Sequence, residues 1–96
     1  MKILVDIDGT ICESVEGKYD TASPLPQHIE KINRLYDEGN TVIYYTARGR
    51  RSGTDYTELT VDQLTDWGCK FHGVIMNHKL DYDLMICDKT KRIEEI

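Results

Sequence analysis

The sequence contains no long apolar segment. Three apolar residues, 3–5, follow Met1 and Lys2, but Asp6 and Asp8 interrupt them, so the apolar region of a secretion signal is missing. Nothing approaches the roughly 20 apolar residues that a membrane-spanning helix requires. We therefore expect a cytoplasmic protein without a membrane partner.

Cysteine is scarce, and its positions do not indicate pairing. The three cysteines, Cys12, Cys69 and Cys87, are odd in number and form no Cys-x-x-Cys motif. This pattern favours free thiols in a reducing compartment. A zinc site that also uses the three histidines is the alternative, but no two of these ligands have a recognised spacing. Free thiols are the preferred interpretation.

Positive charge is in the minority. The chain has 12 lysine and arginine residues against 17 aspartate and glutamate residues, a formal net charge of -5. Surfaces that bind long nucleic acids carry clustered lysine and arginine, which displace counterions. The basic cluster of this sequence, Arg48, Arg50 and Arg51, is a local feature. No long nucleic acid partner is expected.

The residues that are present fit one small folded domain, 1–96. Hydrophobic residues make up 40% and charged residues 30%, as in ordinary soluble globular proteins. Apolar runs without period-2 alternation are typical of strands buried on both faces, and here they alternate with amphipathic stretches. This order predicts βαβ units and a parallel sheet. The predicted strands are 3–5, 41–45, 73–76 and 84–87.

The apolar periodicity predicts two helices. The first covers 26–38. The second ends at Trp67; Thr60 and Gln63 fit the capping-box pattern, although the helix could start several residues earlier. Its predicted core-facing residues are Val61, Leu64 and Trp67. Between the first strand and the first helix, 9–25 form a connection longer than most, and such loops are usually functional.

Polar residues follow three of the predicted strands at their carboxyl ends, where ligands bind in open α/β sheets. Asp6 and Asp8 end the first strand, Thr46 follows the second, and Asp88 follows the last. Because they are two residues apart, Asp6 and Asp8 point to one face of a continuing strand. Three carboxylates form an oxygen-rich site suited to magnesium. Mg²⁺ is therefore the expected cofactor.

Magnesium beside a carboxylate indicates phosphoryl transfer. The ion neutralises phosphate oxygens, so that an aspartate can attack the phosphorus. A second aspartate can protonate the leaving oxygen and later deprotonate water. Thr46 and Lys79 offer donors to the charged transition state, and Gly9 lets a phosphate oxygen approach the backbone.

The ordered set Asp6-Ile7-Asp8-Gly9-Thr10, Thr46, Lys79 and Asp88 resembles the four motifs of the haloacid dehalogenase superfamily. The resemblance covers residues 2–89. Shorter stretches look like small members without a cap domain that are known as capsule-biosynthesis phosphatases: 5–12, 32–36, 45–49 and 63–68. The resemblance implies a three-layer Rossmann-like α/β fold with a small parallel sheet and no cap domain.

The same resemblance implies a role for each motif residue. Asp6 would be the catalytic nucleophile that forms an aspartyl-phosphate, and Asp8 the catalytic acid and base that also offers its backbone carbonyl to magnesium. Asp88 would complete the metal site with Asp6 and Asp8. The implied substrate-binding residues are Gly9, Thr10, Thr46 and Lys79. The expected activity is a magnesium-dependent phosphatase acting on a small-molecule phosphomonoester, with sugar phosphates first and nucleotide or polynucleotide 3′-phosphates second.

The chain departs from close relatives at two motifs. Cys87-Asp88 stands where paired acids are frequent, and Leu80 follows Lys79 where proline is frequent. Cys87 leaves one carboxylate fewer to fix the ion. The sequence ends eight residues after Asp88, so a closing helix over 89–96 would be short and could need a partner subunit. A homo-oligomer is therefore an open alternative.

Without a cap, the site would be roofed by the 9–25 loop. The arginines that follow Thr46 could clamp the rest of the substrate through bidentate contacts. Arg48 is the preferred substrate-binding residue among them. For Arg50 and Arg51, a solvated loop is an equally good interpretation.

Two other functions stay open. A phosphoacceptor receiver domain also gathers aspartates, a threonine and a lysine around magnesium, but its acceptor lies on a central strand with the threonine and lysine later. Here Asp6 and Asp8 open the chain instead. A catalytically inactive binding module with the same fold is the second alternative, and the intact pair of aspartates argues against it.

Overall fold

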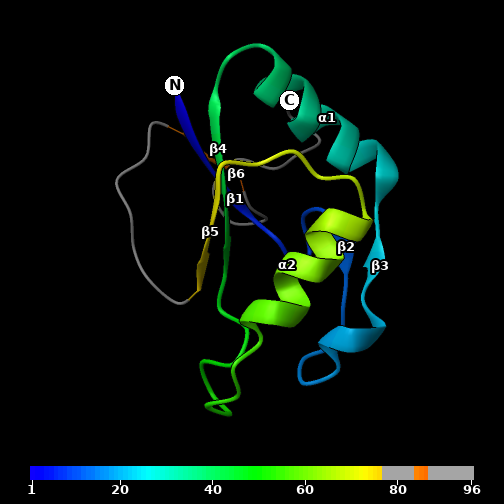
Figure 1. Cartoon of the computed structure of the whole chain (residues 1–96). Helices are drawn as coiled ribbons and strands as arrows, with labels where there is room; N and C mark the ends of the chain where they lie inside the picture. Colours follow the sequence, from blue (N-terminus) through cyan, green and yellow to red (C-terminus); the bar gives the residue numbers. More distant parts are fainter. Residues whose placement is uncertain (77–83, 87–96) are drawn as a thin grey trace.

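A four-stranded parallel sheet forms the centre of the protein. In a computed structural model, residues 1–76 and 84–86 are described (Figure 1). The sheet order is β5-β4-β1-β6. Its strands are β1 (Lys2–Asp6), β4 (Thr41–Thr46), β5 (Gly73–Met76) and β6 (Leu84–Ile86). The four predicted strands and their parallel pairing are confirmed. The bounds differ by one residue at both ends of β1 and at the end of β4, and Cys87, the predicted end of the last strand, lies outside the described residues.

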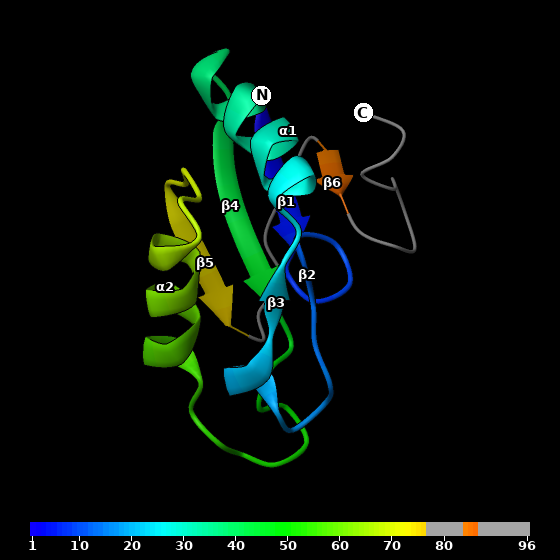
Figure 2. The same cartoon turned by 90° about the vertical axis from the view of Figure 1, so that its right-hand side faces the viewer.

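Two α-helices lie against one face of this sheet (Figures 1 and 2). They are α1 (Pro26–Asp37) and α2 (Thr57–Asp66). Proline at the start of α1 suits a position whose N–H needs no helical partner. The predicted α/β class is therefore confirmed, and two of its three predicted layers lie in the part of the chain that the structure describes.

The start of α2 differs from the prediction. Its N-cap is Tyr56, and no side chain caps the helix there. Thr60 and Gln63 lie inside the helix, so the capping-box assignment is wrong, and their side chains have another partner described below. Val61 is exposed at 36%, whereas Leu64 is fully buried as predicted.

The core is made by the central strands and the inner faces of the helices. β1 and β4 lie between other strands of the sheet, and they carry several of the most deeply buried aliphatic residues. Burying such side chains contributes about 1.5 to 3 kcal/mol each before entropy is counted. The buried cluster consists of Ile3, Val5, Ile7, Ile11, Cys12, Ile29, Ile32, Val42, Tyr44 and Leu64.

The long 9–25 connection is folded. It contains the antiparallel pair β2 (Cys12–Glu13) and β3 (Ser23–Pro24), with the 3-10 turn η1 (Tyr19–Thr21) between them. Its base is fixed by backbone hydrogen bonds from Gly9 to Cys12 (2.9 Å) and from Leu25 to Ile11 (2.8 Å). The loop therefore holds a defined position beside the carboxyl end of β1. Within the described ranges, no helix is both long and apolar enough to cross a membrane.

The 47–56 loop connects β4 to α2 and extends past the carboxyl end of the sheet (Figure 1). Gly49 in this loop has a φ of 85°, a conformation that side chains disfavour. A Cβ atom there would also meet the Thr54 carbonyl and lie 3.2 Å from the Tyr56 ring. Gly53 has a similar φ of 73° but open space around it. Gly49 is therefore required both for backbone conformation and for close packing of the loop.

The two glycines make a matched pair of substitutions. We expect Gly53→Ala to lower the free energy of unfolding by about 1 kcal/mol, the cost of a side chain at positive φ. Gly49→Ala should cost clearly more, about 2 kcal/mol or above, because it adds the contact with Thr54. Urea denaturation measures both, and equal losses would show that the packing around Gly49 contributes nothing.

Candidate active site

Asp6 and Asp8 lie at the carboxyl end of the central strand β1. Asp6 is the last residue of β1 and pairs in register with Tyr45 of β4. Both aspartates are partly buried and line one pocket of about 440 Å³. The other lining residues come from the 9–25 and 47–56 loops and are Glu16, Gly17, Tyr19, Ala47, Arg48, Gly49, Arg50, Arg51, Ser52 and Tyr56. The sheet thus presents two carboxylates to a space bounded by two loops.

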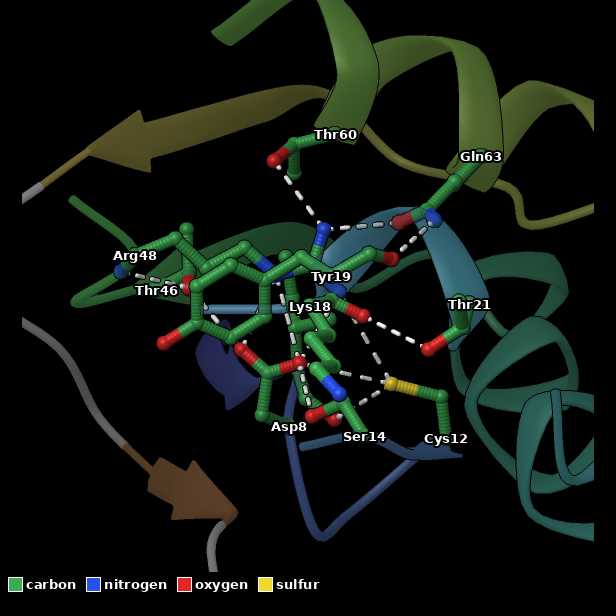
Figure 3. Close-up of polar contacts among 11 residues, drawn as sticks. Asp8, Cys12, Ser14, Lys18, Tyr19, Thr21, Thr46, Arg48, Thr60 and Gln63 are labelled. Atoms are coloured by element: carbon green, nitrogen blue, oxygen red, sulfur yellow. Dashed lines mark hydrogen bonds and ion pairs between the residues drawn. The ribbon is translucent and has the colours of Figure 1, made fainter. Parts of the chain in front are cut away.

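The Asp8 carboxylate forms an ion pair with Arg48, whose side chain is fully buried (Figure 3). The guanidinium Nη2 donates to Oδ1 at 2.8 Å, and Nε donates to Oδ2 at 3.0 Å. Thr46 Oγ1 donates to Oδ2 at 3.2 Å, and Ser14 Oγ donates to Oδ1 at 2.8 Å. Both carboxylate oxygens therefore accept hydrogen bonds, and Asp8 is held in one orientation.

The remaining donors of Arg48 bind helix α2. Nη1 donates to Thr60 Oγ1 at 3.2 Å and to Gln63 Oε1 at 2.7 Å. Gln63 in turn donates to the carbonyl of Tyr19 at 2.7 Å, and the Tyr19 ring lies 4.9 Å from the guanidinium carbon. These contacts join β1, β4, α2 and the 9–25 loop at one point (Figure 3).

The surroundings of Asp8 change two pKa values. Burial acts to raise the pKa of Asp8, but the hydrogen bonds and charge of Arg48, with Ser14 and Thr46, outweigh it and hold that pKa below its usual range. Burial, followed by the negative charge of Asp8, raises the pKa of Cys12 to about 12. Cys12 is therefore a neutral thiol that donates to Asp8 Oδ1 at 3.6 Å, and it is no nucleophile at neutral pH.

The other residues predicted for the site lie in different surroundings. Thr46 is buried, and its hydroxyl donates to Asp8 and accepts from the backbone N–H of Arg48 at 3.1 Å. Thr10 is buried, and its backbone carbonyl lies 2.7 Å from His28 Nδ1. Gly9 is exposed, with a φ of 83°. Lys79 and Asp88 lie outside the described residues.

The predicted third metal ligand is among those undescribed positions. Within 1–76 and 84–86, no group of three histidine, cysteine, aspartate or glutamate residues is placed to hold a metal ion. The part of the chain that the structure describes therefore contributes Asp6 and Asp8 from the end of β1 and Glu16 from the 9–25 loop to the pocket, and these three carboxylates are not grouped to hold an ion. The substrate contact expected of Arg48 stays a prediction, and its side chain donates hydrogen bonds to Asp8, Thr60 and Gln63.

Sequence reasoning missed the partners of Arg48. Thr60 and Gln63 are three residues apart, a spacing that places them on one face of a helix as well as in a capping box. Thr60 and Gln63 lie on the same side of α2 as the buried Leu64. Two polar residues on the core-facing side of a helix could have indicated that they bind a buried polar group. No sequence signal indicated Ser14 as a donor to Asp8.

Comparison with known proteins supports the fold. Comparisons with protein-family models and with curated proteins each found no match. A structural-genomics target from Vibrio cholerae is similar, with a TM-score of 0.73 and 18% identity over 82% of this chain and 71% of that chain. D,D-heptose 1,7-bisphosphate phosphatase from B. bronchiseptica, solved with magnesium and phosphate, has a TM-score of 0.59 and 22% identity over 83% of this chain. This chain spans about half of that phosphatase, 51% of its length. These likenesses show the haloacid dehalogenase-like fold that the motifs predicted.

The ion pair between Asp8 and Arg48 should make a measurable contribution to the free energy of unfolding. Replacing Arg48 with Met leaves the Asp8 carboxylate, Thr60 and Gln63 without their donor. Because the Asp8 side chain is 26% exposed, water screens part of the loss, and we expect the free energy of unfolding to fall by about 2 to 4 kcal/mol. Adding Asp8→Asn should recover part of that loss in a double-mutant cycle. Strictly additive losses in urea denaturation would contradict the pairing.

The lowered pKa of Asp8 predicts how stability depends on pH. A carboxyl group with a lower pKa in the folded than in the unfolded chain stabilises the fold fully above its unfolded pKa, here near 3.8. That contribution is lost as the pH falls through the folded value. We expect Asp8→Asn to show a smaller loss of unfolding free energy than the wild type between about pH 6 and about pH 3. Identical losses in the two proteins, measured with a metal chelator present, would show that Asp8 is not the group responsible.

Proposed function

We propose that this chain is a magnesium-dependent phosphatase that hydrolyses a phosphomonoester through an aspartyl-phosphate on Asp6. The observation that carries the proposal is the difference between two neighbouring carboxylates in one pocket. Asp8 is fixed by Arg48, Thr46 and Ser14, and Asp6 faces the same space from the end of β1. We assign proton transfer to the hydrogen-bonded Asp8 and attack on phosphorus to Asp6.

Asp6 acts as the nucleophile in this proposal. An oxygen of its carboxylate attacks the phosphorus, and the bond between phosphorus and the leaving oxygen breaks. Water then attacks the phosphorus of the aspartyl-phosphate, which releases inorganic phosphate and restores Asp6. The end of a central parallel strand is a suitable place for this group, because the surrounding strands limit its movement.

Asp8 transfers the protons. Protonated Asp8 gives a proton to the leaving oxygen in the first step, and its carboxylate takes one from the attacking water in the second. Because the ion pair with Arg48 holds the pKa of Asp8 below its usual range, Asp8 must leave that pair to take up the first proton. The hydrogen bonds from Arg48, Ser14 and Thr46 fix the orientation of the ionised Asp8 carboxylate. Arg48 and Thr46 are positioning residues here, since their donors contact Asp8.

The residues present fit magnesium, a hard cation that prefers oxygen ligands. Asp6 would bind it through the carboxylate. Both carboxylate oxygens of Asp8 already accept hydrogen bonds, so Asp8 would reach the ion through its backbone carbonyl, the atom that the family resemblance assigns. Asp88 is the proposed third protein ligand. When bound, the ion offsets the negative charge of the phosphate.

A sugar phosphate is the preferred substrate, and a nucleotide or polynucleotide 3′-phosphate is the second choice. The structurally similar phosphatase from B. bronchiseptica is named for a heptose bisphosphate and was solved with magnesium and phosphate. The pocket volume of about 440 Å³ falls in the range of about 300–1,000 Å³ that small-molecule sites occupy. Lys79 and the backbone at Gly9 are the proposed contacts of the transferred phosphate.

The assay is phosphate release from an aryl phosphate in the presence of magnesium. Asp6→Asn should lower the turnover by about three orders of magnitude or more, because the nucleophile is removed. Asp66→Asn, at the exposed end of α2, is the matched control and should behave as the wild type. A chelator should stop the reaction, and rapid quenching should trap one phosphate on wild-type protein.

Two results would contradict the proposal. Turnover by Asp6→Asn at the rate of the Asp66→Asn control would discard Asp6 as the nucleophile. Release of no more than one phosphate per protein molecule would point to a phosphoacceptor domain that signals.

A further inference from the structure

The outer part of the pocket carries arginines that the proposed chemistry does not use. Arg50 and Arg51 lie in the 47–56 loop and line the same pocket as Asp6 and Asp8. Arg48 binds Asp8 and α2, whereas the side chain of Arg51 is 87% exposed. The wall of the pocket therefore has positive charge available beyond the reaction centre.

Arg51 already holds an anion. Its Nη1 lies 3.6 Å from Oε1 of Glu16, which belongs to the opposite loop and also lines the pocket. Both side chains are largely exposed, 87% for Arg51 and 67% for Glu16, and such pairs contribute only about 0 to 1 kcal/mol. A bound group with higher negative charge can therefore displace Glu16 at little cost.

A phosphate group is suited to that exchange. It carries more charge than a carboxylate, and the guanidinium fork can bind two of its oxygens at once. Arg50, the adjacent cation, lies on the same loop as Arg51. Its Nη2 donates to the hydroxyl of Tyr45 in β4 at 3.2 Å. The carboxylate of Glu16 thus marks the place that an anionic group of the ligand would take.

The pocket can also hold the atoms between two phosphates. Its volume exceeds what one phosphate group needs, and Tyr19 and Tyr56 form part of its wall. Their rings pack edge to face with centroids 5.0 Å apart, and the guanidinium carbon of Arg48 lies 4.9 Å from the centre of the Tyr19 ring. Aromatic faces of this kind contact the carbon skeleton of a sugar or a nucleoside.

We propose that Arg51, assisted by Arg50, binds a second phosphate on the leaving group, and that this phosphate displaces Glu16. The substrate class is then a bisphosphorylated small molecule. This inference rests on the phosphatase function proposed above and specifies the substrate of that same site. Glu16 acts as a substitute anion that joins the two loops when no ligand is bound.

The test compares kcat/KM for four substrates: an aryl phosphate, a hexose monophosphate, a hexose bisphosphate and a nucleoside bisphosphate. Wild-type protein should prefer one bisphosphate over the monophosphate by about tenfold or more, and the two bisphosphates decide between sugar and nucleoside. Arg51→Gln should remove most of that preference, mainly through KM. Glu16→Gln should lower KM for the preferred bisphosphate.

Arg34→Gln is the matched control. Arg34 forms an equally exposed ion pair with Glu30 at 3.7 Å, but on α1 and away from the pocket. The ratio of bisphosphate to monophosphate kcat/KM should be the same in this variant as in the wild type. An equal ratio in Arg51→Gln and Arg34→Gln would overturn the second-phosphate site, while phosphatase activity on the aryl phosphate would leave the proposed function standing.

If wild-type protein releases phosphate from none of the four substrates, the proposed function fails and binding decides the inference. Calorimetry would then compare the affinity of the hexose bisphosphate for the wild type, Arg51→Gln and Arg34→Gln. Weaker binding in Arg51→Gln alone supports the site. Equal binding in all three proteins, or no binding, rejects it.

Discussion

The arrangement of the site depends on the burial of one guanidinium group. An arginine that loses its water must find acceptors for its donors, or the fold is strongly destabilised. In this chain the acceptors come from Asp8 after β1 and from Thr60 and Gln63 of α2. The need to satisfy Arg48 therefore sets where α2 lies relative to the end of the sheet.

The same contacts give the two aspartates different surroundings. Asp8 follows β1 and turns toward Arg48, so that its carboxylate is enclosed by donors from three segments. Asp6 remains in the strand and lines the pocket. Two identical side chains, two residues apart, thus have different surroundings. The proposed mechanism relies on such a difference, because it assigns acid–base chemistry to one carboxyl group and nucleophilic attack to the other.

The sheet and the site were predictable to different degrees. Buried parallel strands show as apolar runs, so β1, β4 and β5 follow from residues that lie close together in the sequence. The sequence also predicted that Asp6 and Asp8 lie on the same side of the chain, because side chains two residues apart in a strand point the same way, and both line one pocket. The partners of Arg48 did not follow, because a long side chain can reach several elements and the Thr60–Gln63 spacing fits a capping box equally well. The start of α2 was missed for a related reason: no capping side chain marks Tyr56.

The ion pair between Asp8 and Arg48 also affects the electrostatic force that the site exerts on an approaching anion. The two charges lie 2.8 Å apart and cancel, so together they neither attract nor repel an approaching phosphate at long range. In the proposed phosphatase, the attraction of an anionic substrate would therefore come from the bound cation and from Arg50 and Arg51 in the 47–56 loop. Salt in solution screens the charge of such exposed groups. Binding of the proposed substrate would then depend on ionic strength, whereas the contact between Asp8 and Arg48, whose guanidinium is buried, would depend on it little.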